Sequence, residues 1–316
     1  MKRSVVLCAS LLVLALIPGL ASAQGWLLPG LPSFGGNGCG SCYGNLGGVS
    51  IGGDVAYVGY SRATVIDFTA QGPGLIIGGE RGWKQSYPVH GIQLSGMATA
   101  AANDRVTLIA RGTWLFPWNG ESFEEYNFGG GFGQGRHWST STQWWTVDGA
   151  GAFAISGSAA AIGGLRYDSF MTNFKDPSEQ FGINGRAGDE ADLQASLWIP
   201  YGGVLVHHGG AKFGVIGFPW VPGTIKYGQT IGGTNVRLNG SGAVKSGYFL
   251  EAFAEFNANL MGASAGLFAK YTYVRAKAQV DMDRSPSTDN DTFDVVLDRP
   301  NWIFGAQAKL NFSSPF

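Results

Sequence analysis

The feature that most constrains this chain is a hydrophobic alternation with a period of two along its final segment. In residues 301–312 every even position is apolar, while the odd positions are mainly polar. The apolar face consists of Trp302, Phe304, Ala306, Ala308, Leu310 and Phe312. A period of two indicates a β-strand and not a helix. A strand of about ten residues with an aromatic near each end is long enough to cross an outer membrane.

The same alternation recurs along the chain and predicts about ten strands in all. It is clear in residues 248–258 and 265–273, and weaker in residues 49–60, 89–100, 106–116, 142–155, 161–172, 191–199 and 204–218. The connections between these segments alternate in length. We expect short turns centred on Asn103-Asp104, Gly157-Ser158, Gly202-Gly203 and Gly262, and long loops at residues 63–88, 117–141, 173–190, 219–247 and 280–300.

A sheet placed in lipid must close on itself, because unpaired backbone groups at an open edge cannot be satisfied there. The predicted fold class is therefore all-β, a closed antiparallel transmembrane β-barrel of about ten strands (roughly 8–12), with short periplasmic turns and long extracellular loops. The alternative is a soluble β-sandwich. A sandwich tolerates the alternation, but not a charge-free face that is repeated on most strands.

The N-terminus predicts export. Lys2 and Arg3 precede an apolar run that ends in Ala21-Ser22-Ala23, as in a secretory signal peptide cleaved after Ala23. We therefore divide the chain into a signal peptide (1–23), a Gly-rich periplasmic segment (24–47) and an outer-membrane barrel (48–316). A retained membrane anchor is the alternative for the first segment.

Two cysteines, Cys39 and Cys42, form a C-G-S-C motif in the Gly-rich segment. The periplasm is oxidising, which favours a local disulfide between them. A redox-active role is the weaker alternative, because no thioredoxin-like βαβ pattern surrounds the motif. Haem attachment would need a histidine where Tyr43 stands, and a four-thiolate metal site lacks its second pair. We expect no metal and no cofactor.

The charge of the predicted mature chain gives no sign of a nucleic-acid partner. Without Lys2 and Arg3 the 21 basic residues become 19, against 22 acidic ones, so the net charge is 19 − 22 = −3. The mean hydropathy of +0.05 suits a barrel in which only every second side chain meets lipid. Nucleic-acid binding proteins carry a basic excess, so this class is excluded.

The chain resembles the small bacterial outer-membrane β-barrel proteins in its signal peptide, its alternating strands and its terminal strand. The segment 301–312 is similar to the C-terminal signal of that family, with either Phe312 or Phe316 as the terminal aromatic. The resemblance implies a Gram-negative outer membrane, insertion by the barrel-assembly machinery, and contact with outer-membrane lipids and lipopolysaccharide. The omptin proteases of similar size join an Asp pair to an Asp-His pair. Asp281 and Asp283 could imitate the first pair, but no histidine here follows an aspartate by two residues.

The strand phase also predicts which charged residues face the lumen. Because a buried charge needs a partner, we expect salt bridges between Glu251 and Lys270, which a hairpin would place directly opposite each other, and between Asp148 and Arg166. So small a barrel is largely filled by its own side chains. The lumen is then a structural plug, with a narrow solute path as the alternative.

The predicted outer loops carry the remaining candidate residues. The aromatics of the Gly-rich segment 117–141 either recognise another surface or fold inward over the barrel mouth: Trp118, Phe123, Tyr126, Phe128 and Trp138. Arg275 and Lys277 could contact lipopolysaccharide, or could be ordinary solvated strand ends.

These observations favour a non-enzymatic outer-membrane protein with a structural or surface-interaction role through its extracellular loops. The alternatives are a narrow porin-like channel for small solutes, and a lipid-modifying enzyme that would depend on His137. The sequence identifies no extracellular partner.

Overall fold

The computed structural model describes residues 49–59, 64–70, 82–127, 132–178, 189–232, 237–260, 263–285 and 290–312. The predicted signal peptide and the segment with Cys39 and Cys42 lie outside these ranges. The described chain is all-β. It contains no helix that is long and apolar enough to span a bilayer.

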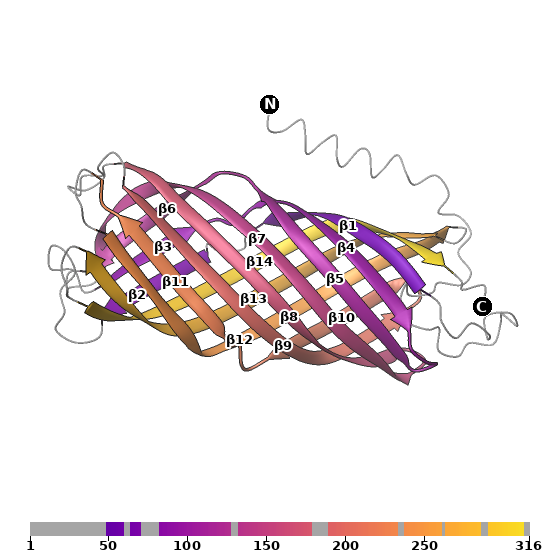
Figure 1. Ribbon diagram of the computed structural model, residues 1–316. Coiled ribbons are helices and arrows are strands. Elements are labelled where there is room, and N and C mark those ends of the chain that lie inside the picture. The colour runs from indigo at the N-terminus through magenta and orange to yellow at the C-terminus, as the bar shows by residue number, and fades with distance from the viewer. Residues whose placement is uncertain are drawn as a thin grey trace, which may run out of the picture.

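Fourteen antiparallel strands form one sheet, which is drawn out into a long barrel-shaped ring (Figure 1). The strands are β1 (Val49–Gly59), β2 (Thr64–Ala70), β3 (Gly82–Tyr87), β4 (Gly91–Ala101), β5 (Val106–Pro117), β6 (Gly120–Asn127), β7 (Phe132–Ser156), β8 (Ala159–Ser178), β9 (Glu190–His208), β10 (Ala211–Phe218), β11 (Gly223–Thr230), β12 (Arg237–Leu260), β13 (Ala263–Ser285) and β14 (Asn290–Phe312).

The pairings run around the ring in two circuits. One passes through β1, β4, β5, β7, β8, β9, β10, β12, β13 and β14, and returns to β1 because Val49–Gly59 pairs with Phe312–Trp302. The other replaces β1, β4, β5 and β10 by β2, β3, β6 and β11, and returns from β14 to β2. We call the part around the first circuit the turn half and the part around the second the loop half. They occupy opposite ends of the ring (Figure 1).

The prediction of about ten strands is wrong, since the sheet has fourteen. The reason is that four lines of chain are each divided into two strands along the barrel: β1 with β2, β4 with β3, β5 with β6, and β10 with β11. Two of the breaks contain proline, namely Pro88 and the pair Pro219 and Pro222, and a third follows Pro117, the last residue of β5. Proline cannot donate to the ladder, so the pairing stops there. Isolated backbone hydrogen bonds, such as the one from Trp198 N–H to Pro222 O (2.8 Å), connect the strands across a break.

One predicted turn is also in the wrong place. Gly202 and Gly203 lie inside β9, and the chain reverses at Gly209 and Gly210 between β9 and β10. Gly209 has φ of 58°, which glycine adopts at no steric cost. Gly203 is required for a different reason, because a Cβ at this position would collide with the Val215 carbonyl oxygen of the next strand.

The long loops are shorter than predicted, because strands occupy much of them. Segment 117–141 holds β6 and the start of β7, and segment 219–247 holds β11 and the start of β12. Between the loop-half strands lie residues 71–81, 128–131, 179–189, 231–236 and 286–289, most of them outside the described ranges. The described turns at the other end are residues 102–105, 157–158 and 209–210.

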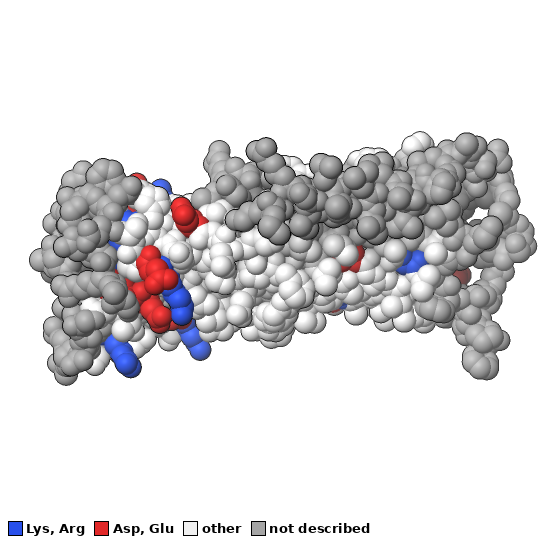
Figure 2. Space-filling view, turned by 90° about the horizontal axis from the view of Figure 1, so that it is seen from above, with Lys and Arg blue, Asp and Glu red and all other residues white. Residues whose placement is uncertain are grey.

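The two halves have opposite polarity. In the turn half the outer face is apolar, with residues such as Val215, Leu267 and Leu310 about half exposed, and charged residues point inward. In the loop half the inner face is mainly apolar and most charged residues point outward, apart from a buried cluster of Arg136, Glu124 and Asp189. Figure 2 shows the result on one face: a broad uncharged band, with acidic and basic side chains gathered toward the loop end.

Candidate functional site

The lumen of the turn half holds a network of ion pairs. Asp54 of β1 binds Arg111 of β5 at 2.6 Å, and Lys212 of β10 lies 3.4 Å from Glu255 of β12. These side chains face inward because their strands alternate with an apolar outer face. Each charge has an opposite partner, which is the condition for tolerating charge inside a barrel.

Arg166 of β8 is the centre of this network. Its guanidinium donates to Asp148 of β7 at 3.1 Å and to Glu251 of β12 at 3.0 Å. The Tyr201 hydroxyl donates to Asp148 at 2.5 Å, and Phe249 lies under the guanidinium at 5.0 Å. Because β8 and β12 are not neighbours in the sheet, Arg166 connects separate parts of the wall across the lumen.

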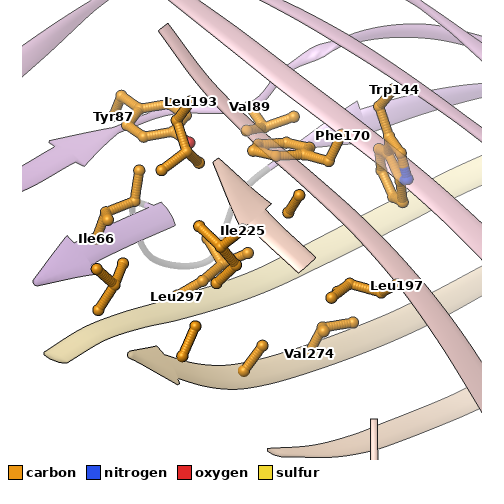
Figure 3. Close-up of a cluster of buried hydrophobic side chains, with 14 of the residues drawn as sticks. Ile66, Tyr87, Val89, Trp144, Phe170, Leu193, Leu197, Ile225, Val274 and Leu297 are labelled. Atoms are coloured by element: carbon orange, nitrogen blue, oxygen red, sulfur yellow. The ribbon is translucent and has the colours of Figure 1, made fainter. Parts of the chain in front are cut away.

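The lumen of the loop half is filled by apolar side chains. Ile66, Leu193, Val280 and Leu297 are all fully buried. Figure 3 shows how residues from strands on different sides of the ring point toward one another, with Ile66, Leu193, Ile225 and Leu297 among those that meet. This packing resembles the interior of a soluble protein more than a water-filled pore.

An aromatic group closes this core at the level of β2, β3, β11 and β14. Phe68 stacks on Trp83 with ring centroids 4.2 Å apart, and Tyr227 lies 4.8 Å from Phe68. Phe293 meets the edge of Trp83 at 5.6 Å. Since β11 is separated from β2 and β3 by several strands on either side, these contacts also bridge the lumen.

A buried ion pair lies where the polar and apolar halves meet. Arg299 of β14 and Asp168 of β8 form a two-point contact, with side chains only 1% and 3% exposed, and one of its hydrogen bonds measures 3.1 Å. The guanidinium lies 4.6 Å from the Trp144 ring and 4.8 Å from the Phe170 ring. Along β14, Arg299 stands between Leu297 of the apolar core and Ile303, which lines the polar lumen.

A second buried charge cluster lies nearer the loop end. Arg136 of β7 donates to Glu124 of β6 and to Asp189 at 2.8 Å each, and its guanidinium covers the Trp138 ring at 4.2 Å. The Trp138 indole donates to Glu124 at 2.5 Å, and Asp189 also accepts the Gly232 backbone N–H. The cluster fixes the ends of four segments to one another.

Burial shifts the pKa of several groups in the loop half, of which Tyr87 and Asp67 are two. Desolvation raises the pKa of the Tyr87 hydroxyl, which lies in the apolar core, while a hydrogen bond with Thr172 opposes this. Desolvation also raises the pKa of Asp67 on the outer face, and the charge of Lys84 lowers it in part. Both groups therefore favour their protonated forms relative to free side chains.

The outer surface is layered along the barrel. On the side of the apolar band nearer the loop end lies a layer of aromatic pairs, including Tyr248 with Tyr273 at 5.4 Å and Tyr271 with Trp302 at 5.0 Å. Beyond it come exposed ion pairs between β13 and β14, Arg275 with Asp298 at 3.7 Å and Lys277 with Asp294 at 3.2 Å. The two residues proposed to contact lipopolysaccharide thus stand just beyond the aromatic layer, each beside an acidic residue.

The structure brings both predicted lumen pairs together. Arg166 and Asp148 lie directly opposite each other in the β7–β8 register, with a contact of 3.0 Å. Lys270 and Glu251 are 3.8 Å apart, but Glu251 faces Thr272 and not Lys270. The contact is diagonal because the hairpin reverses later in the chain than expected.

The proposed loop-recognition residues do not form one exposed group. Trp138 is buried at 1% exposure, because it packs inside the ring under Arg136. Phe123 lies on the outer face of β6, 5.0 Å from His137, and Trp118 is exposed between β5 and β6, 5.6 Å from Tyr57. Tyr126 belongs to β6, and Phe128 lies outside the described residues. For Trp138 the burial matches the alternative that these aromatics fold inward, since β7 begins earlier than expected and carries this side chain into the ring.

The histidines are scattered. His137 is half-buried on the outer face, His90 lies beside exposed Trp118, and His207 and His208 end β9 in the turn half. Asp281 and Asp283, the residues that could imitate an omptin Asp pair, are exposed on β13. Within the described ranges, no three His, Cys, Asp or Glu side chains gather as a metal site.

Sequence reasoning missed Arg299, Arg136, Glu124 and Asp189. All lie in segments predicted as loops or at their edges. A signal for Arg299 was available, because extending the phase of residues 301–312 by one step places it on the inward face.

Comparison with solved structures identifies the class of fold. The outer-membrane protease OmpT from Escherichia coli is similar with a TM-score of 0.67 and 12% identity, over 83% of this chain and 97% of that one. OprG from Pseudomonas aeruginosa (TM-score 0.36, 13% identity, 85% and 98% covered) and the translocator domain of NalP from Neisseria meningitidis (0.40, 12%, 84% and 88%) are more distant. No protein-family model matches the chain, and no curated protein does.

The chain has the fold of the bacterial outer-membrane β-barrel proteins, as its sequence pattern predicted. At 12% identity the likeness to OmpT is one of fold.

Proposed function

We propose that this protein is a closed, non-conducting barrel of the bacterial outer membrane, with a structural or surface-interaction role at its extracellular end. One observation carries the proposal: the apolar core of the loop half fills the lumen, with side chains such as Ile66, Phe68 and Leu193 at 0% exposure. Ions and small polar solutes cross an apolar, close-packed region only at a high desolvation cost. A narrow porin-like channel is therefore disfavoured.

The outer face supports the proposed placement in the membrane. An apolar band flanked by aromatic pairs matches the lipid-facing surface of an outer-membrane barrel, in which short turns are periplasmic and the longer connections extracellular. The loop half then projects from the membrane, with its ion pairs in water. This geometry supports a rigid, sealed platform presented at the cell surface.

The proposal is non-enzymatic, and the positions of the histidines support it. A general base must lie within hydrogen-bond reach of a nucleophile or substrate. His137 instead lies against Phe123 on the outer face, with no carboxylate among its described contacts. The lipid-modifying alternative would need His137 to act from this position.

Contact with lipopolysaccharide is a further part of the proposal. Arg275 and Lys277 expose 46% and 48% of their side chains just beyond Tyr248 and Tyr273, at the level where lipid phosphates would lie. Basic side chains there can bind phosphate in exchange for their acidic neighbours.

Planar-bilayer recording tests the seal. We expect the purified, folded protein to give no steady single-channel steps, while an open porin recorded in the same bilayers does. Steady steps that appear in proportion to inserted protein would contradict the proposal and favour the channel. Heat-modifiable migration on gels confirms that the recorded protein is folded.

A further inference from the structure

Among the described residues, the charged side chains of the turn-half lumen include several that keep part of their surface accessible. In the turn half, inward side chains of the ion-pair network keep part of their surface accessible: 24% for Arg111, 16% for Lys212, 17% for Glu255, and 11% for both Arg166 and Asp148. Their partners Asp54, Glu251 and Lys270 are more deeply buried, at 3%, 6% and 9%. At the junction both members of the pair are buried, at 1% for Arg299 and 3% for Asp168. Beyond them the core residues are fully buried.

A cavity lies at the inner end of this accessible space. Its wall includes Arg111 and Thr113 of β5, Trp144 of β7, and Lys270 and Thr272 of β13. Ile303 of β14 forms part of its apolar side, next to the junction with the core. The cavity is therefore at the depth where the polar lumen ends.

Three polar atoms of the cavity wall lack a hydrogen-bond partner. They are the Arg111 Nε, the Trp144 Nε1 and the Thr272 hydroxyl, all buried. Asn301, which pairs with Thr272 in the sheet, also has a buried amide without a partner. Buried polar groups in proteins are normally satisfied by protein atoms or by ordered water. Two of the three wall atoms can only donate, so they require an acceptor.

The charge around the cavity indicates what that acceptor is. Three basic side chains, Arg111, Arg166 and Lys270, are matched by three acidic ones, Asp54, Asp148 and Glu251. A net ion is not needed to balance them, whereas water satisfies donors and acceptors together without adding charge.

We propose that the turn half of the lumen is a water-filled blind vestibule, which small polar molecules enter from the turn end and which stops at the cavity beside Trp144. It rests on the proposed seal, because without the apolar core the same water would continue through the barrel. The vestibule gives small solutes of the periplasm access to a charged site inside the membrane and prevents their passage.

Cysteine labelling tests the vestibule directly. In a background with Cys39→Ser and Cys42→Ser, Ser95→Cys and Thr113→Cys place thiols in the polar lumen, and Val280→Cys places a matched thiol in the apolar core. The small cation methanethiosulfonate ethylammonium is the probe, and mass spectrometry follows its addition. We expect Ser95→Cys and Thr113→Cys to react at least about tenfold faster than Val280→Cys, because reaction needs access and a thiolate.

The side of entry is the second measurement. In vesicles where a tag in residues 71–81 reports the loop end as outward, external probe should leave Thr113→Cys unlabelled, while probe trapped inside should label it. Equal, slow labelling of folded Thr113→Cys, Ser95→Cys and Val280→Cys would overturn the vestibule and leave the seal intact. Fast labelling of Thr113→Cys from the loop side would overturn the seal and the blind end together.

Discussion

Ion pairs of two kinds occur at the residue scale, and exposure separates them. The Arg299–Asp168 and Arg136–Glu124 pairs are at most 7% exposed, whereas the pairs of Arg275 and Lys277 are 28–48% exposed. Losing one member of a buried pair leaves an uncompensated charge and costs about 3–5 kcal/mol. An exposed pair contributes only about 0–1 kcal/mol, so its basic member can exchange an aspartate for another anion at little cost.

This difference leads to a prediction for Arg275 and Lys277. The double variant Arg275→Gln and Lys277→Gln should fold with a stability within about 1 kcal/mol of the parent, because only exposed pairs are lost. It should retain clearly less lipopolysaccharide on purification, because two cations beside the aromatic layer are gone. Mass spectrometry of lipid bound per barrel measures the effect.

A matched control separates lipid binding from surface charge in general. Lys84 also belongs to an exposed pair, with Glu125 at 3.8 Å, but it stands on β3, which carries neither of the outer aromatic pairs Tyr248–Tyr273 and Tyr271–Trp302. Lys84→Gln should therefore keep the parental lipid content. Equal lipid content in the double variant and the parent would rule out a phosphate contact at Arg275 and Lys277.

Which residues meet inside the barrel was predictable where the strand phase was clear. Asp148 and Arg166 face each other across a two-residue turn, so the alternation alone placed them together. Arg299 was not found, because Pro300 precedes the clear alternation and suggested a loop. Arg136 was missed because the Gly-rich sequence before it hides the start of β7.

At the scale of the element, strand existence was easier to predict than strand length. On β13 the apolar residues occupy odd positions up to Tyr273 and even positions from Val274 to Met282, with no residue inserted. The face that meets lipid gives way to a face that meets the core. From sequence alone this change looks like the end of an amphipathic strand, and for that reason residues 280–300 were predicted as a loop.

The revised turn of β9 and β10 can be checked with two glycines. Gly209→Ala should destabilise the barrel by about 1–2 kcal/mol, because φ of 58° places an alanine in the left-handed region. Gly202→Ala should be nearly neutral, since a Cβ there meets only the Ile162 backbone oxygen at 3.8 Å. Urea unfolding in lipid vesicles measures both. A larger loss for Gly202→Ala than for Gly209→Ala would return the turn to Gly202-Gly203.

For the whole molecule, the sequence predicted the class of fold but not the apolar core on which the proposed seal rests. The apolar core draws single residues from most strands, including Ile66, Leu193, Ile225, Val274 and Leu297, which lie far apart in the chain. No local pattern reports that they converge, because their meeting depends on ring closure and on the common level of the strand breaks. The sequence alone therefore does not decide between a plug and a narrow path.

The opposite polarity of the two halves predicts where the membrane ends. Val215 stands on the outer face of β10 with 51% exposure, between the outward-facing Val204 and Ala252 of the adjacent strands. Ala243 is also exposed and outward, but it pairs with Thr224 of β11 in the loop half. Val215→Arg should destabilise the folded barrel in vesicles by about 2–4 kcal/mol, while Ala243→Arg should cost at most about 1 kcal/mol.

Comparing the stability loss of the two variants separates the effect of lipid from that of core packing, because neither side chain faces the lumen. Detergent provides the internal control, since micelles adapt to a charge more easily than a bilayer does. The difference between Val215→Arg and Ala243→Arg should therefore narrow in micelles. If the two variants lose the same stability in vesicles, the prediction is contradicted, because the lipid boundary would not follow the aromatic layer. The loop half would then lie within the membrane, where its ion pairs would carry a high desolvation cost.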